Sequence, residues 1–116
     1  MSDQRGMTIV EVLVAVLVLS VGLLALTTAA AAVTRMVDDG KRSTEAAALA
    51  GERVELLLAN GCPVLGGGST AKGPFTIGWE VAATAGARAR AITVVVARTT
   101  PRGTRADTVR TLHSCP

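Results

Sequence analysis

The stretch GMTIVEVLVAVLVLSVGLLAL, from Gly6 to Leu26, decides the fold because it is apolar over nearly its whole length. No charged residue occurs from Val12 to Thr34, and a helix over this range would span roughly 30 Å of hydrocarbon. Glu11 is the exception near the start. A carboxylate at the middle of a bilayer costs on the order of 2.5 to 3.5 kcal/mol, and less near an edge. The pattern predicts a membrane-spanning helix whose acidic residue needs a compensating partner.

Two interpretations of this N-terminus compete. In the first, it is an ordinary secretory signal with Arg5 in its basic region, Val12 to Leu26 as its apolar region and cleavage near Ala31. In the second, it is a retained helix. Glu11 and the length of the apolar run favour the second, as does a helical pattern that continues beyond the alanines. The residues that continue it on one face are Ala46, Ala50, Val54 and Leu57.

The residues Gly6-Met7-Thr8-Ile9-Val10-Glu11, after the polar leader MSDQR, resemble the class III signal of the type IV pilin and type II secretion pseudopilin family. The resemblance implies that a prepilin peptidase cuts after Gly6 and that the new N-terminal residue, Met7, is N-methylated. Glu11 is then the fifth residue of the mature chain. In this family that glutamate recruits subunits to a filament by neutralising the N-terminal amine of a neighbour. Such a pair attracts strongly at low dielectric, which would offset the cost of burying Glu11.

The resemblance also implies partners and a location. The partners are other pilin or pseudopilin subunits, the prepilin peptidase, an inner-membrane assembly platform and membrane lipid. The chain would cross the inner membrane once, with a cytoplasmic leader and a periplasmic C-terminal region. Arg35, Lys41 and Arg42 follow the span while Arg5 precedes it, so the positive-inside rule alone favours the reverse orientation. We follow the resemblance, because the cysteines need an oxidising compartment.

Cys62 and Cys115 are the two cysteines, and their positions predict a disulfide that ties the C-terminus to the end of the helix. The competing interpretation is a metal site completed by His113. Two cysteines and one histidine give three ligands where a structural zinc site normally has four. We therefore expect a disulfide, with no metal and no cofactor.

The remaining chain predicts a small sheet. Residues 60–74 read as a glycine-rich loop, and residues 75–82 alternate apolar and polar side chains as a strand does. Ala91 to Ala97 is a β-branched run, and Thr108 to Leu112 is a weaker third strand. We expect the α+β class: a long N-terminal helix, transmembrane in its first half, packed on a small three-stranded antiparallel sheet. The pilin resemblance implies the same arrangement.

The predicted organisation has four parts: a leader at 1–6, a transmembrane and filament-core half-helix at 7–34, an amphipathic half-helix at 35–60 and a β domain at 61–116. Ser20 and Gly22 are small residues at which another helix could approach closely. Without a proline between Met7 and Gly61, the helix is expected to be continuous, with a bend possible at Gly40.

The C-terminal region is basic. From Asn60 onward, the sequence holds seven basic residues and only two acidic ones, Glu80 and Asp107. DNA is one partner for such a surface, but Phe75 and Trp79 are better placed in a core than on a stacking platform. We expect solvated loop charge or an acidic neighbouring subunit instead. The basic residues are Lys72, Arg88, Arg90, Arg98, Arg102, Arg105 and Arg110.

Enzymatic interpretations find little support. The segment GGGSTAKG lacks the Gly-Lys-Ser/Thr of a phosphate-binding loop, and Pro74 follows it in place of a helix. His113 has no evident nucleophile and acid around it. We expect a minor pilin or minor pseudopilin, because the exported part is small, and no enzymatic activity. The alternative is a secreted basic binding module whose signal peptide is cleaved near Ala31.

Overall fold

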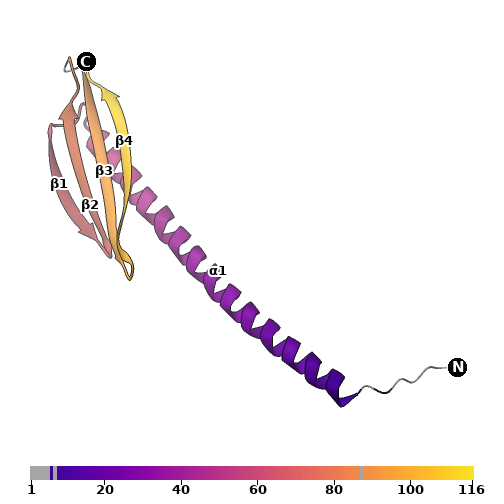
Figure 1. The fold of residues 1–116 in the computed structure, drawn as a ribbon. Helices are drawn as coiled ribbons and strands as arrows, with labels where there is room; N and C mark the ends of the chain where they lie inside the picture. The colour runs from indigo at the N-terminus through magenta and orange to yellow at the C-terminus, as the bar shows by residue number, and fades with distance from the viewer. Residues whose placement is uncertain (1–5, 7, 87) are drawn as a thin grey trace. The chain divides into compact units, whose positions relative to one another are not determined.

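The computed structural model describes residue 6 and residues 8–86 and 88–116, so the predictions for Met7 and for the first five residues of the leader lie outside the described residues. The chain divides into two compact units between Asp39 and Gly40. Figure 1 shows the elements, which follow the order α1 (Ile9–Leu58), β1 (Gly66–Lys72), β2 (Phe75–Ala83), β3 (Ala89–Thr100) and β4 (Gly103–Ser114).

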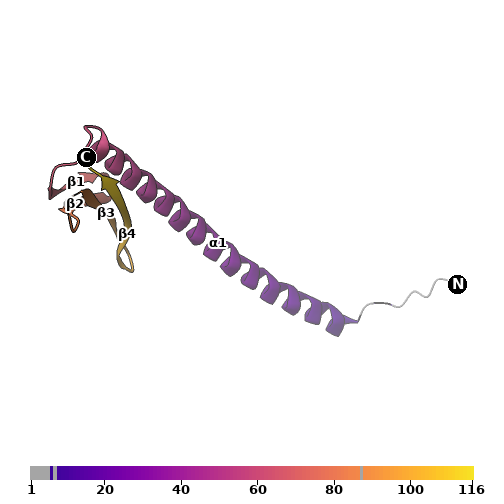
Figure 2. The ribbon, with the colours of Figure 1, turned by 90° about the horizontal axis from the view of Figure 1, so that it is seen from above.

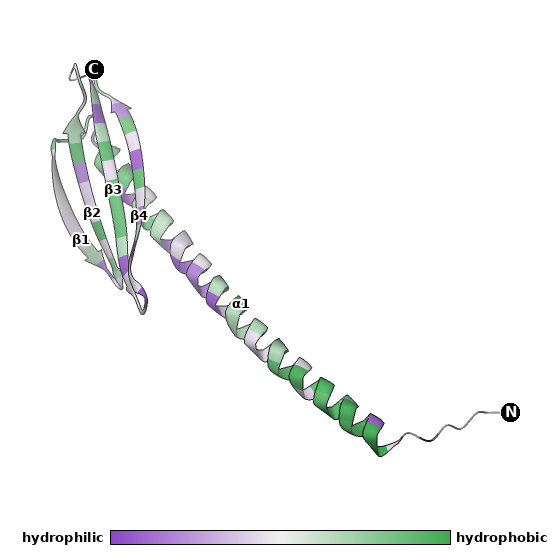
Figure 3. Ribbon diagram, in the orientation of Figure 1, coloured by the Kyte–Doolittle hydropathy of each residue, from purple (hydrophilic) through white to green (hydrophobic). Residues whose placement is uncertain are grey.

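The first unit is the apolar half of α1. Its described residues are all exposed, and in Figure 3 the ribbon of this half-helix is coloured as hydrophobic over most of its length. An 18-residue window of this helix has a mean hydropathy of 2.9, so by length and composition α1 could cross a membrane. A helix that is apolar all round is stable only when something covers it, in a large core, in a bilayer or among other helices.

Hydroxyl groups along this half-helix bond to their own backbone. Ser20 Oγ donates to the Val16 carbonyl at 2.7 Å, and Thr34 Oγ1 donates to the Ala30 carbonyl at 3.1 Å. Thr27 and Thr28 donate in the same way to carbonyls three residues earlier, each at 2.8 Å. These side chains therefore need no water to satisfy their donors, which suits them to hydrocarbon.

The second unit is a four-stranded antiparallel sheet in the order β1-β2-β3-β4, with the C-terminal part of α1 across one face, as Figure 2 shows from above. Directly opposed residues of antiparallel strands share a face. The apolar positions predicted for β2 and for the helix do form this interface. Its buried residues are Ala46, Leu49, Ala50, Phe75, Ile77, Val81, Ile92, Val94 and Val96, with Val54, Leu57, Leu58, Trp79 and Val109 packed against them.

The sheet has four strands, and the prediction of three was wrong. The missed strand, β1, lies within the glycine-rich segment that was expected to be a loop. Its glycines disfavour a strand by propensity, but pairing with β2 supplies hydrogen bonds and Trp79 supplies a packing partner. Gly68 lies opposite Trp79, and a Cβ at Gly68 would lie 2.5 Å from Trp79 Cζ2. Glycine at this position lets the indole ring lie against the backbone of β1.

Strands β3 and β4 are longer than expected. They continue to Thr100 and resume at Gly103, so the predicted connection shrinks to a turn at Pro101 and Arg102. Gly103 has a φ of +117°, a backbone conformation that residues other than glycine rarely adopt. Thr100 Oγ1 donates to the Gly103 carbonyl at 2.6 Å. The helix assignment of α1 continues without a break through Gly40.

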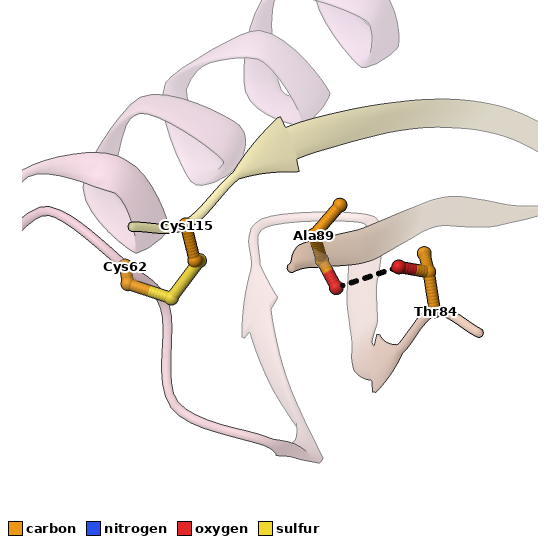
Figure 4. The surroundings of a disulfide bond; sticks show 4 residues. All are labelled: Cys62, Thr84, Ala89 and Cys115. Atoms are coloured by element: carbon orange, nitrogen blue, oxygen red, sulfur yellow. Dashed lines mark hydrogen bonds between the residues drawn. A yellow bond between two sulfur atoms is a disulfide. The ribbon is translucent and has the colours of Figure 1, made fainter. Parts of the chain in front are cut away.

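The C-terminus is fastened at one end of the sheet. Cys62 and Cys115 form the expected disulfide, with their Cα atoms 5.4 Å apart (Figure 4). The Cys115 amide donates to the Arg88 carbonyl at 2.8 Å. Beside it, the amide and the hydroxyl of Thr84 both donate to the Ala89 carbonyl, at 3.1 and 3.0 Å. One covalent bond and this hydrogen-bonded loop thus hold the helix end, the β2–β3 connection and the end of β4 together.

Candidate assembly and processing site

The first turn of α1 is built around Thr8. The Glu11 amide donates to Thr8 Oγ1 at 3.3 Å, and the Val12 amide donates to the Thr8 carbonyl at 3.3 Å. Thr8 is therefore the N-cap residue, which satisfies one of the backbone donors that a helix start leaves unpaired. Glu11 stands three residues further on, at the spacing of a capping box. The sequence from Thr8 to Glu11 thus sets where the helix begins.

Glu11 is exposed and is the acidic residue of the first turn. A negative charge there is favoured by the positive end of the helix dipole, by about 0.3 to 1 kcal/mol at a surface. Among the described residues, the one ion pair within 4.0 Å is Lys72 with Glu52, so the Glu11 carboxylate has no cationic partner in this part of the chain.

Gly6 precedes this turn, and a Cβ added to it would meet no described atom within 4 Å. Met7, the residue after the predicted cleavage point, lies outside the described residues.

Thr8 is the functional residue that our sequence reasoning missed. The signal was available, because Thr-x-x-Glu directly before an apolar run predicts a capped helix start. The prediction for Glu11 concerned its charge, in hydrocarbon and beside a neighbouring N-terminal amine, and did not include its place in a capping box. Ser20 bonds within its own helix and Gly22 faces open space, so the prediction that these two residues pack against another helix stays a prediction.

His113 lies on β4 opposite Arg90 and is partly buried. Both cysteine sulfurs are in the disulfide, which leaves no thiolate to bind a metal beside it. In the described ranges, no three His, Cys, Asp or Glu side chains come together as a metal-binding group.

Arg98 differs from the prediction of solvated loop charge. It lies on β3, is only 5% exposed, and its Nε and Nη1 atoms are buried without a hydrogen-bond partner among the described residues. Two other basic side chains have clear roles. The Arg53 guanidinium lies 3.5 Å from the centre of the Trp79 ring, and Lys72 Nζ lies 3.4 Å from Glu52 Oε2.

The comparisons with known proteins agree with the site. Residues 1–27 match the family model described as the prokaryotic N-terminal methylation motif. Searches against curated proteins and against solved structures gave no match. The match therefore covers the leader and the first turns of α1, and the sheet unit stands outside it.

Proposed function

Because this chain carries the N-terminal methylation motif of type IV pilin-like precursors, we propose that it is a minor pilin or minor pseudopilin, a structural subunit and not an enzyme. Prepilin peptidase cuts it after Gly6, and Met7 becomes the methylated N-terminus. The mature subunit is stored in the inner membrane through the first half of α1, with its sheet unit in the periplasm. It then enters a pilus or secretion filament.

One observation supports this proposal above the others: the motif leads directly into an apolar half-helix that no other described residue covers, with Glu11 as the acidic residue of its first turn. In a filament, helices of neighbouring subunits would cover this surface. The N-terminal amine of a neighbour would supply the cation that Glu11 lacks. A paired and desolvated carboxylate is far more favourable than a lone one.

The small second unit favours a minor subunit. One face of one sheet and three buried helix residues form its core, and a disulfide fastens its end. Domains of this size commonly need such a staple. The disulfide also suits the periplasm, which is oxidising.

The alternative, a secreted module cleaved near Ala31, has less support. The helix assignment of α1 runs from Ile9 to Leu58 and shows no break at the alanines. Signal peptidase would have to cut within this helix. The match of residues 1–27 to the methylation motif would then have no explanation.

The deciding experiment is the mass of the N-terminal peptide of protein isolated from its own host. We expect the peptide to begin at N-methylated Met7. A peptide beginning near Ala32 would overturn the proposal in favour of the secreted module. The Gly6→Leu variant is the matched control: a side chain there meets no described atom of the chain, so the fold should persist while the leader stays attached.

A further inference from the structure

One end of the sheet gathers basic side chains. By register, Lys72 lies opposite Phe75, Phe75 opposite Arg98, and Arg98 opposite Arg105, so these residues form one row across all four strands. Arg102 lies just beyond the row, in the β3–β4 turn. We call Lys72, Arg98, Arg102 and Arg105 the basic end.

The positive charge of the basic end is largely uncompensated. Lys72 pairs with Glu52 on α1, but Arg102 and Arg105 are exposed, and no ion pair within 4.0 Å is found for either in the described part of the chain. Arg98 is nine-tenths buried, with two nitrogens lacking a partner. Asp107 is the one acidic side chain of β4, opposite Val96. The adjoining stretch of α1, residues 40–46, holds two basic residues and one acidic residue, Lys41, Arg42 and Glu45.

A buried guanidinium without a counter-charge adds to the field at the surface above it, because low dielectric screens it poorly. Arg98 therefore raises the positive potential at Arg102 and Arg105. Exposed arginines present planar donor forks that match phosphate oxygens. The chemistry of the basic end is that of a site for phosphate groups.

The position of the basic end along the chain indicates which phosphates it meets. The disulfide fastens Cys62, four residues after the end of α1, at the opposite end of the sheet, and Arg53 lies over Trp79 in the middle. The basic end is thus on the side at which α1 enters the second unit, at Gly40. Gly40 follows Thr34, the last residue of the uncharged span, by six residues. Six residues reach at most about 20 Å, so Gly40 stays near the bilayer surface in any orientation of the two units.

We propose that the basic end binds the phosphate groups of anionic phospholipids at the surface of the membrane that stores the subunit. This inference rests on the proposed function for its membrane anchor. Each basic residue close to an anionic surface strengthens binding by about fivefold. The site holds the sheet unit against the bilayer until the subunit enters a filament, when the contact must break.

The test uses the mature full-length chain in vesicles of phosphatidylcholine, alone or mixed with phosphatidylglycerol. Amide hydrogen exchange of Thr100, Arg102 and Gly103 reports docking, and each variant is compared with itself in the two vesicle types. We expect slower exchange in the anionic vesicles, by about tenfold, and loss of that protection at high salt. In the double variant Arg102→Gln and Arg105→Gln, the ratio of docked to free protein should fall about 25-fold.

The matched control is Arg88→Gln with Arg110→Gln, which removes the same charge outside the basic end and should keep the protection. Equal exchange of the unsubstituted chain in both vesicle types would overturn the proposal. An equal loss of protection in the control double variant would also overturn it. Protection in neutral vesicles that rises with subunit density would assign the site to a second copy of the chain instead. Release of the chain by alkaline carbonate would contradict the membrane anchor of the proposed function. If the chain stays in the membrane but shows no lipid-dependent protection, only the docking proposal is contradicted.

Discussion

Glu11 has a local role at the start of α1. Within its own chain it follows the Thr8 cap by three residues and lies at the positive end of the helix dipole, so its charge is compatible with the helix start. That contribution is small beside the cost of placing a carboxylate in hydrocarbon. In the filament that we propose, the larger compensation comes from the N-terminal amine of a neighbouring subunit.

We expect Glu11→Ala to remain in the membrane and to fail to enter filaments. Loss of one member of a buried ion pair costs about 3 to 5 kcal/mol, which should reduce co-assembly by about two orders of magnitude or more. The fraction in sheared filaments and in the membrane is measured by immunoblot. Glu55→Ala, which removes an exposed carboxylate in the second unit, is the control. Wild-type levels of Glu11→Ala in filaments would refute the pairing.

Arg98 illustrates a residue kept at a cost to stability. A buried cation without a partner is destabilising, and apolar replacements of buried ionic groups often gain about 1 to 4 kcal/mol. We expect Arg98→Met to raise the free energy of unfolding of the second unit, measured with urea in detergent micelles. Arg110→Met, at an exposed position, should change it by less than about 0.5 kcal/mol. A loss of stability in Arg98→Met would mean that the guanidinium has a stabilising partner.

Among the elements, β1 packs against the indole ring of Trp79 at Gly68. Trp79 is held between the Arg53 guanidinium on one element and the Gly68 backbone on another. Cation–π contacts of this kind contribute about 0.5 to 2 kcal/mol, depending on exposure. The indole therefore links α1, β2 and β1.

We expect Gly68→Ala to destabilise the second unit by about 1 to 3 kcal/mol, because its Cβ would force the indole to move. Trp79 is the single tryptophan, so its fluorescence reports both the unfolding and the changed environment. Gly78→Ala is the control, since its Cβ would find Val95 O at an ordinary 4.0 Å. Equal stability of the two variants would contradict the packing role assigned to Gly68.

At the scale of the whole molecule, the stability of the second unit depends on one disulfide, between Cys62 and Cys115. The disulfide joins residues 53 positions apart, and by chain entropy a loop of that length contributes about 4 kcal/mol. This is a large share of the stability of a small domain. The apolar half of α1 lies outside the loop that this disulfide closes.

We therefore expect reduction of the disulfide, or serine at both Cys62 and Cys115, to lower the free energy of unfolding of the second unit by about 4 kcal/mol. Urea unfolding followed by Trp79 fluorescence measures it. Reductant should not affect the double-serine variant, and membrane retention should be unchanged in both cases. A change below about 1 kcal/mol would show that the sheet is stable without its staple.

Features that depend on neighbours in the chain could be predicted from the sequence: the apolar span, the processing motif around Gly6 and Glu11, the alternation in β2 and the helical face from Ala46 to Leu57. The pairing of Cys62 with Cys115 was also predictable, since two cysteines allow one partnership. These signals are local or leave one choice, and hydrophobic periodicity directly reflects burial on one face.

Tertiary structure alone decided β1, the burial of Arg98 and the stack of Arg53 on Trp79. A glycine-rich segment has little strand propensity. It forms a strand because it pairs with β2 and because the Trp79 indole packs against it. Arg98 looked like a loop charge because its burial depends on how far β3 extends and on which helix residues lie opposite. Contacts between distant segments fix such features, and their energies are absent from any local pattern of residues.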